Sequence, residues 1–322
     1  MKTKEIIKKY AIYLVLVILL VIFSLSSDKF MTSSNLFTIA RQTAMVGIAS
    51  AGFIFVMIIG GIDLSAGSMV TLVNILVAWL MVNAGMNPLL ACLIGIAVCV
   101  LTGFFNGWVV ANIGIPPLIA TLATQIALAG AAYLMCNGLP IFGFDKGFAM
   151  LGQGYLWIIP VPVIVMAVCL LASSFILNKT FFGRHFYALG SNAEAAELSG
   201  IRVKRLTYLA YSMSGFFAGL SGVVLLSRTN SGQPGAGLGF EFDVITALVL
   251  GGVSVSGGAG AISSAVAGIL IIGVLSNGFV IVGINTYVQQ IIKGAILLVA
   301  VGFDCIQKKR QSQAGKKPER SK

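Results

Sequence analysis

Continuous apolar runs, each about as long as a lipid bilayer is thick, follow one another through most of this 322-residue chain. A helix needs roughly 20 residues to cross the hydrocarbon layer. Runs of about this length lie at residues 10–26, 43–62, 64–84, 88–112, 115–136, 155–178, 206–227, 242–256, 259–283 and 285–303. Because the runs do not alternate with polar residues, they favour helices over the strands of a membrane β-barrel. We therefore expect an all-α polytopic membrane protein with about ten transmembrane helices.

The composition agrees with this fold class. Only 10% of the residues are charged and the mean hydropathy is +0.99, whereas soluble domains carry about 25% charged residues. We expect residues 1–305 to form a single transmembrane domain and residues 306–322 to form a basic, disordered cytoplasmic tail. The first apolar run follows a basic start, as in a signal peptide. No small-residue cleavage motif comes after it, so we expect a retained helix.

Basic residues cluster in three short segments, and this clustering sets the expected topology. Residues 2–9, 179–205 and 308–322 hold four, five and seven of the 21 lysines and arginines. Basic segments remain on the cytoplasmic side of a membrane, and ten spans place all three there, with both termini cytoplasmic. The net charge of +11 is therefore better explained by membrane topology than by nucleic-acid binding. We expect a multi-pass protein of the cytoplasmic membrane.

The segment 179–205 is the longest interior stretch that is too polar to lie in a membrane. Within it, Ala193–Leu198 consists of helix-forming residues, and Gly200 follows as a typical helix stop. The sequence contains no GxxxxGK[ST] phosphate loop. It also lacks the intramembrane chain of acidic residues and histidines that proton-coupled carriers use. We interpret the short helix as the contact through which a separate motor protein moves the membrane domain.

Polar residues inside apolar runs are costly, and such residues are functional candidates by default. Asp63 lies in the stretch GGIDLSAGS between two runs, where it either caps the following helix or takes part in gating. Lys293 lies within the last run and faces either the bundle interior or a partner subunit. As residues of a translocation path or its gate we select Asp63, Ser65, Asn106, Thr121, Thr124, Asn277 and Lys293.

The five cysteines indicate no metal site. Their spacing matches neither a CxxC motif nor a Cys/His motif, and most lie in or beside apolar runs, where cysteine acts as a small packing residue. They are Cys92, Cys99, Cys136, Cys169 and Cys305. We expect no metal and no cofactor in this chain.

Separated blocks of the sequence resemble permease subunits of bacterial ABC importers, in the ribose/simple-sugar branch of the branched-chain amino acid/ribose permease family. EAAELSG, from Glu194 to Gly200, is similar to the EAA-x3-G signature by which such permeases dock on their ATPase. The matching blocks are GGIDLSAGS (60–68), FNGWVVANIGIPPLIATLAT (105–124), FGRHFYALGSNAEAAELSGI (182–201), GLGFEFDVITALVLGGVSVSGGAG (237–260) and SNGFVIVGINTYVQQIIKGAILLVAVGFD (276–304). Departures such as Ala66 leave the coupling block intact and the sugar identity open.

The resemblance implies a vitamin-B12-importer-like arrangement of helices in the bacterial inner membrane, with a path between two permease subunits, expected to be a homodimer. A binding protein outside would deliver a pentose or hexose, ribose being the first expectation. A cytoplasmic ATPase with two fused nucleotide-binding halves would hold ATP and Mg, so this chain is not itself an enzyme. The coupling residues would be Gly183, Arg184, Glu194, Ala195, Ala196 and Gly200. Added bulk at Gly200 would uncouple ATP hydrolysis from uptake.

The docking site and the solute leave alternatives open. Docking of the binding protein would involve the outer-side charges of Lys146, Arg228 and Glu241, although Glu241 also suits a helix N-terminus. The same architecture could import a furanosyl signalling compound, a nucleoside or a branched-chain amino acid. A self-contained secondary carrier is the remaining alternative.

Overall fold

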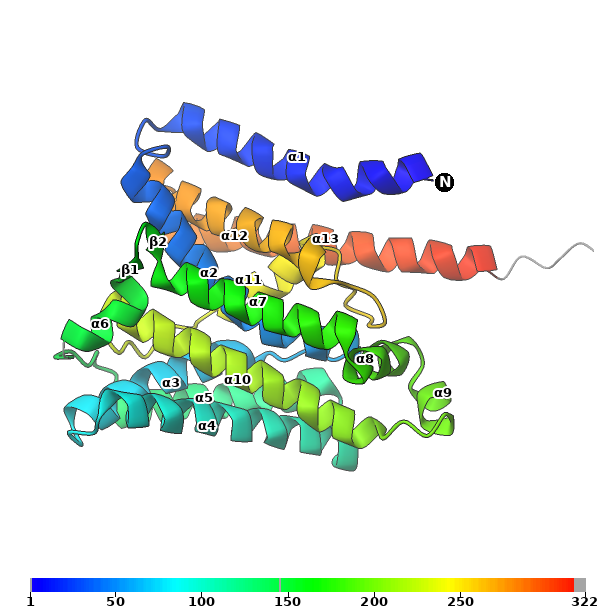
Figure 1. Cartoon of the computed structure of the whole chain (residues 1–322), viewed down its shortest axis with the longest axis horizontal. Coiled ribbons are helices and arrows are strands. Elements are labelled where there is room, and N and C mark those ends of the chain that lie inside the picture. The colour runs from blue at the N-terminus through cyan, green and yellow to red at the C-terminus, as the bar shows by residue number, and fades with distance from the viewer. Residues whose placement is uncertain (1, 145, 316–322) are drawn as a thin grey trace, which may run out of the picture.

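The computed structural model describes residues 2–144 and 146–315 as a bundle of helices (Figure 1). The helices are α1 (Lys2–Ser26), α2 (Ser33–Ile58), α3 (Ser65–Val82), α4 (Pro88–Trp108), α5 (Pro117–Cys136), α6 (Lys146–Gln153), α7 (Val161–Lys179), α8 (Phe181–Ser191), α9 (Ala193–Leu198), α10 (Val203–Thr229), α11 (Phe240–Leu250), α12 (Ile262–Val282) and α13 (Thr286–Gly315). A π-helical turn, η1 (Val109–Ile113), continues α4. Strands β1 (Tyr155–Leu156) and β2 (Ile159–Pro160) pair antiparallel in a short hairpin.

Within the described residues, 8 helices are long and apolar enough to cross a membrane: α2, α3, α4 with η1, α5, α7, α10, α12 and α13. The expected all-α membrane class is therefore confirmed. The apolar part of α1, Ile12–Ser26, is shorter than a full span, and α11 has only 11 residues where we expected a span over 242–256. The expected total of ten spans therefore stays a prediction.

Two expected boundaries were wrong. The second helix begins at Ser33 rather than near residue 43, because Thr32 caps it: the Asn35 N–H donates to Thr32 Oγ1 at 3.4 Å. The last helix continues to Gly315, so residues 306–315, expected to be disordered, are helical. Their Gln, Lys and Arg residues are good helix formers, and no glycine or proline interrupts them before Gly315. The remainder of the expected tail, residues 316–322, lies outside the described residues.

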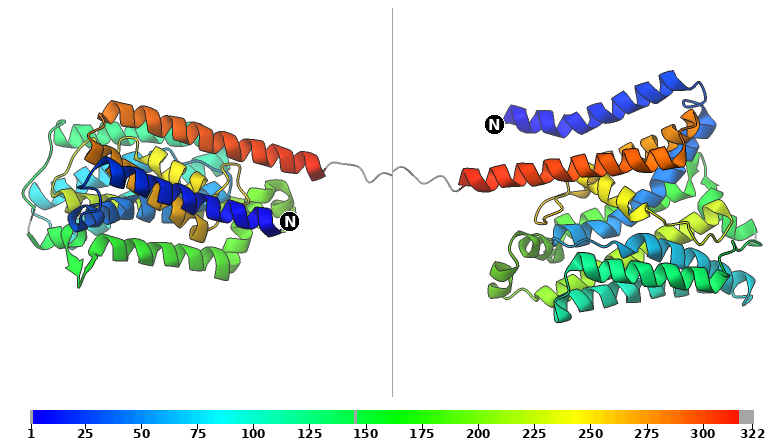
Figure 2. Two further views of the ribbon diagram at one scale, coloured as in Figure 1. Left: turned by 90° about the horizontal axis from the view of Figure 1, so that it is seen from above. Right: turned by 180° about the vertical axis from the view of Figure 1, so that it is seen from behind.

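The bundle has two distinct ends (Figures 1 and 2). The start of α1, the hairpin of α8 and α9, and the C-terminal part of α13 lie at one end, which we call the α9 end. The helix α6 and the β1–β2 hairpin lie at the opposite end, the α6 end. The described parts of the three basic segments, 2–9, 179–205 and 308–315, therefore lie at the same end of the molecule.

Small residues set the packing at the centre of the bundle. A Cβ on Gly103 of α4 would collide with the Tyr211 carbonyl of α10, and a Cβ on Gly215 of α10 would collide with the Cys99 carbonyl of α4. The two helices therefore approach backbone to backbone, as expected where lipid supplies no hydrophobic force for association. The helix α2 is almost completely enclosed, whereas α4, α5 and α13 expose most of their apolar surface.

The first helix joins the bundle through aromatic side chains. Phe23 of α1 lies 5.5 Å from Phe30 and 6.0 Å from Phe279 of α12, measured between ring centroids. Beside this cluster, Asn35 of α2 and Asn277 of α12 exchange two amide hydrogen bonds of 3.0 Å each. The α1–α12 contact therefore forms a small core of its own at the α6 end.

Two non-helical segments enter the bundle, and both precede a helix that begins inside it. Residues 230–239 run beside α3, where the Gln233 N–H donates to Asn74 Oδ1 at 2.8 Å and the Gly237 N–H donates to Thr71 Oγ1 at 2.9 Å. The helix α11 starts only after this segment, which explains its shortness. Residues 59–64 similarly separate α2 from α3. Irregular backbone at membrane depth is tolerated where protein surrounds it or where it lines a cavity.

Candidate functional site

A buried polar network surrounds Asp63, which is 0% exposed. One carboxylate oxygen, Oδ1, accepts hydrogen bonds from the Ser65 N–H at 3.1 Å and the Ser65 hydroxyl at 2.5 Å. The other, Oδ2, accepts from the Ser214 hydroxyl of α10 at 2.7 Å. Asp63 thus holds the start of α3 against α10. The carboxylate lies one residue before the N-cap position, which Leu64 occupies.

The neighbouring helices α4 and α5 extend this network. The Asn106 amide of α4 donates to Ser65 Oγ at 2.9 Å, and the Thr124 hydroxyl of α5 donates to Asn106 Oδ1 at 2.6 Å. Thr121 of α5 accepts from the Leu64 N–H at 3.1 Å. Asp63, Ser65, Asn106, Thr121 and Thr124, selected separately from the sequence, are therefore joined around one non-helical segment. Their role in transport stays a prediction.

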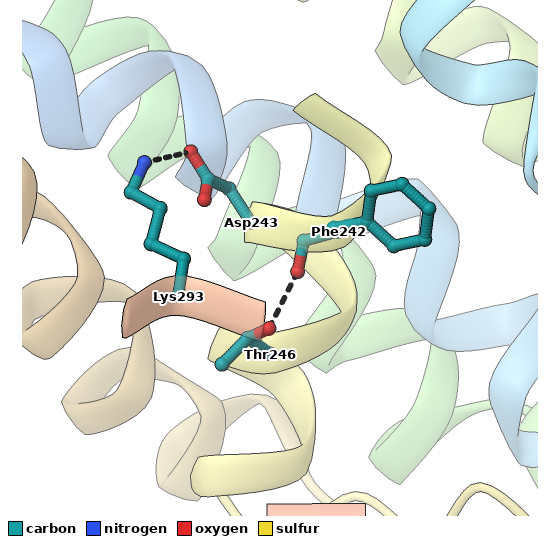
Figure 3. Close-up of polar contacts among 4 residues, drawn as sticks. All are labelled: Phe242, Asp243, Thr246 and Lys293. Atoms are coloured by element: carbon teal, nitrogen blue, oxygen red, sulfur yellow. Dashed lines mark hydrogen bonds and ion pairs between the residues drawn. The ribbon is translucent and has the colours of Figure 1, made fainter. Parts of the chain in front are cut away.

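A second polar region lies between α11 and α13. The Lys293 ammonium of α13 contacts Asp243 Oδ2 of α11 at 2.8 Å, and Figure 3 shows this ion pair crossing from one helix to the other. Thr246, one turn after Asp243, donates its hydroxyl proton to the Phe242 carbonyl at 2.6 Å. A pocket of ≈ 690 Å³ opens here. Its polar lining comprises Gln125, Glu241, Asp243, Thr246, Thr286, Gln289, Gln290 and Lys293.

Glu241 faces into the protein and not toward a partner outside. It is 1% exposed, and its Oε1 accepts from the Gln125 amide of α5 at 2.8 Å. Its Oε2 is also buried and has no hydrogen-bond partner among the described residues. The expectation that Glu241 docks a binding protein is therefore wrong, because the segment 230–239 packs on α3 and carries the first turn of α11 into the bundle.

The remaining candidates lie apart from both polar regions. Asn277 is 3% exposed and engaged with Asn35, so the structure does not join it to the Asp63 network. Arg228, at the end of α10, is partly buried, and its guanidinium contacts Met45 Sδ at 3.6 Å. The side chain of Lys146 lies outside the described residues.

The short helix α9 has the bounds that the sequence predicts, Ala193–Leu198. Asn192 caps its start by accepting from the Ala195 N–H at 3.0 Å, and the Ile201 N–H closes its end on the Ala196 carbonyl at 3.1 Å. Gly200 has a φ of +81°, a left-handed conformation that favours glycine. A six-residue helix is thus held by caps at both ends.

Almost all of α9 is exposed at its end of the bundle. Ala196 packs inward at 4% exposed, whereas Glu194, Ala195 and Glu197 face outward. Leu198 is 85% exposed, although it is a large apolar side chain outside the apolar runs. Leu198 was not among the residues selected from the sequence. Its position inside EAAELSG, between the alanines and Gly200, could have identified it as a candidate. Single exposed apolar residues are common on protein surfaces, so a docking role for α9 stays a prediction.

The helix α8, for which the sequence analysis predicted no structure, connects α9 to the bundle. Gly183 lies against the Leu177 carbonyl of α7, where a Cβ would collide, and Arg184 is exposed. Gly190 lies equally close to the Ile58 carbonyl, which itself accepts the Gly258 N–H at 2.8 Å. The helix therefore touches both the end of α2, just before the Asp63 segment, and the turn that follows α11.

Tyr187 adds a second contact between α8 and that turn. Its hydroxyl donates to the Gly260 carbonyl at 2.6 Å, and burial raises the pKa of the tyrosine above its usual value. The phenol therefore stays protonated at neutral pH and keeps its role as a donor.

A multi-pass helical bundle with polar residues in its interior and a capped, exposed helix at one end has the features of a transport permease. Comparison with known proteins agrees. Residues 35–301 match the family described as branched-chain amino acid transport system / permease component, and the chain belongs to this family. It is a multi-pass protein of the inner membrane.

Curated relatives cover nearly the whole chain. The chain is 40% identical to the ribose import permease protein of Bacillus subtilis over 301 residues, which is 93% of both chains. It is 37% identical to the ribose import permease protein of Escherichia coli K12, covering 90% of this chain and 91% of the relative. It is 35% identical to the L-arabinose transport system permease protein of the same organism, covering 94% and 92%. No solved structure matches the chain.

Proposed function

We propose that this chain is the transmembrane subunit of an ATP-driven importer that carries a pentose, with ribose as the first choice, into the cell. The observation that carries the proposal is α9, a capped and exposed helix with the sequence EAAELSG at the end where the basic segments gather. The relatives named for ribose and arabinose import support a sugar as the solute.

The energy for transport would come from a separate cytoplasmic ATPase with two fused nucleotide-binding halves, which binds ATP and Mg. Its groove would receive α9, with Leu198 as the apolar anchor and Glu194 and Glu197 beside it. Because α8 contacts both Ile58 and the turn at Gly258, a displacement of α9 would move the segments before α3 and after α11 together. Alternating access would follow from this coupled movement, with the sugar delivered outside by a binding protein.

The proposed assembly contains two copies of the chain. The pocket between α11 and α13 opens on the side of the bundle, with Gln290 exposed and Lys293 and Asp243 partly exposed. Lys293 lies seven residues into α13, about 10 Å along the helix axis. Charged groups facing hydrocarbon at that depth are costly, so a protein surface is expected to cover them. A second copy placing the same face against the first would enclose both pockets around one path.

Reconstitution tests this function. The chain would be placed in liposomes with its ATPase and its binding protein, and ATP-dependent uptake of D-ribose, L-arabinose and L-leucine would be measured. Uptake of a pentose and not of leucine is the expected result. Leucine uptake would instead support an amino-acid importer, and uptake by this chain alone on an ion gradient would support a secondary carrier.

A further inference from the structure

The pocket between α11 and α13 contains a carboxylate that the protein itself leaves incompletely bonded. Glu241 lines this pocket and is 1% exposed, and its Oε2 has no partner among the described residues. An unpaired buried polar atom costs free energy, because it has lost its water without gaining a protein hydrogen bond. The Oε2 atom lies against the Gly67 backbone of α3, so a ligand hydroxyl in the neighbouring pocket supplies the missing donor only after a rotation of the Glu241 carboxylate.

The other polar groups of the pocket offer a mixed set of donors and acceptors. Gln125, Gln289 and Gln290 each have an amide that can both donate and accept, while Lys293 donates and Asp243 accepts. The single ion pair between α11 and α13 balances one positive with one negative charge. The lining suits a neutral solute with many hydroxyls, since each hydroxyl donates one hydrogen bond and accepts others.

The size of the pocket and the apolar part of its lining agree with this ligand class. The cavity of ≈ 690 Å³ falls within the range of about 300–1,000 Å³ that small-molecule sites occupy. Phe242, Leu238 and Leu297 supply the apolar walls, against which the C–H face of a sugar ring can pack. The neighbouring groove along α13, lined by Ile292, Ala295 and Val299, is apolar and offers no hydrogen bonds.

We propose that this pocket is a transient sugar subsite within the translocation path, in which Glu241 accepts a hydrogen bond from a sugar hydroxyl and Lys293 and Asp243 bind further hydroxyls. The proposal rests on the proposed function as a sugar permease. Asp243 and Lys293 link the half-helix α11 to α13, so sugar hydroxyls that replace part of this ion pair loosen the contact between the two helices. Asp243 and Lys293 then both bind the sugar and release the contact between α11 and α13.

Cysteine protection tests the subsite directly. In the assembled complex carrying Cys305→Ser, Gln290→Cys places a thiol in the pocket, and Ala295→Cys places a matched thiol on the same helix in the apolar groove. A charged, water-soluble thiol reagent is expected to modify the first and not the second. Excess D-ribose is expected to slow modification of Gln290→Cys at least threefold, and L-leucine is expected to leave it unchanged. Equal modification with and without ribose would overturn the proposal.

A conservative variant at Glu241 supplies the second measurement. Glu241→Gln keeps the shape and the contact with Gln125 but removes the charged acceptor, so ribose uptake is expected to fall roughly tenfold. Uptake would be expressed per assembled complex, so that a loss of assembly is not counted as a loss of the subsite. Uptake equal to the unaltered protein would overturn the subsite while leaving the sugar-permease function standing. No pentose uptake by the unaltered complex would overturn both.

Discussion

Replacing Gly200 by alanine isolates the contribution of helix formation to docking. Gly200 has a φ of +81°, and a Cβ added there would meet no atom within 4 Å. The substitution therefore causes no collision, and its effect is confined to the backbone. An L-residue in this conformation costs about 1–2 kcal/mol, and the lower chain entropy of alanine recovers about 0.4–1 kcal/mol. The net cost is about 1 kcal/mol, which lowers the equilibrium constant for forming the capped α9 about fivefold.

Hydrogen exchange and affinity together measure this effect. The Ser199 and Ile201 amides, bonded to the Ala195 and Ala196 carbonyls, are expected to exchange about fivefold faster in Gly200→Ala. The affinity for the ATPase subunit should fall by up to the same factor, because only the formed helix docks. Gly200→Asn is the matched control, since asparagine tolerates the left-handed conformation. Unchanged exchange of the two amides in the alanine variant, or an equal acceleration in both variants, would refute the reasoning.

Three further substitutions separate docking, stability and transport. Leu198→Ala should weaken ATPase binding about tenfold or more, as measured by titration in nanodiscs, if the side chain is buried on docking. Thermal unfolding of the chain alone should show an unchanged melting temperature. Ser214→Ala removes a donor to the buried Asp63 carboxylate and should destabilise the fold by about 1.5–3 kcal/mol, whereas the exposed Ser264→Ala should match the unaltered protein in the same unfolding assay. Asn277→Ala leaves the Oδ1 atom of Asn35 on α2 without its donor, although the Asn35 amide still donates to the Phe30 carbonyl. It should cost about 1–3 kcal/mol of stability, while uptake per folded chain stays normal; reduced uptake would return this residue to the path.

Hydrophobicity and cap chemistry made much of the fold predictable from the sequence. The apolar runs give the all-α class directly, because a span must satisfy its own backbone hydrogen bonds. The bounds of α9 were predictable because Asn192 and Gly200 are local signals at its two ends. Asp63, Asn106 and Thr124 were selected because they are polar residues in apolar surroundings. The structure places them in one hydrogen-bond network, since buried polar groups need partners.

Other features depend on tertiary packing that no local pattern encodes. Glu241 seemed to be an outer-side charge, and its burial follows from contacts of the 230–239 segment with α3, some 160 residues away in the chain. The polarity of Asn277 resembles that of Asn106, yet its partner is Asn35. The helix α8 was missed because its sequence, FFGRHFYALGS, contains two glycines that signal irregular structure but here allow close approach to Leu177 and Ile58.

The aromatic contact between α1 and α12 also bears on the order in which the protein is made. Roughly 240 residues separate the end of α1 from the start of α12, and at about 5–20 residues per second the ribosome needs roughly 10–50 s to synthesise them. Throughout that time Phe23 has no Phe279 to pack against, and Asn35 has no Asn277. We therefore expect the first helix to remain in the lipid without its α12 contact until α12 has been made, so that this corner of the bundle closes late during biogenesis.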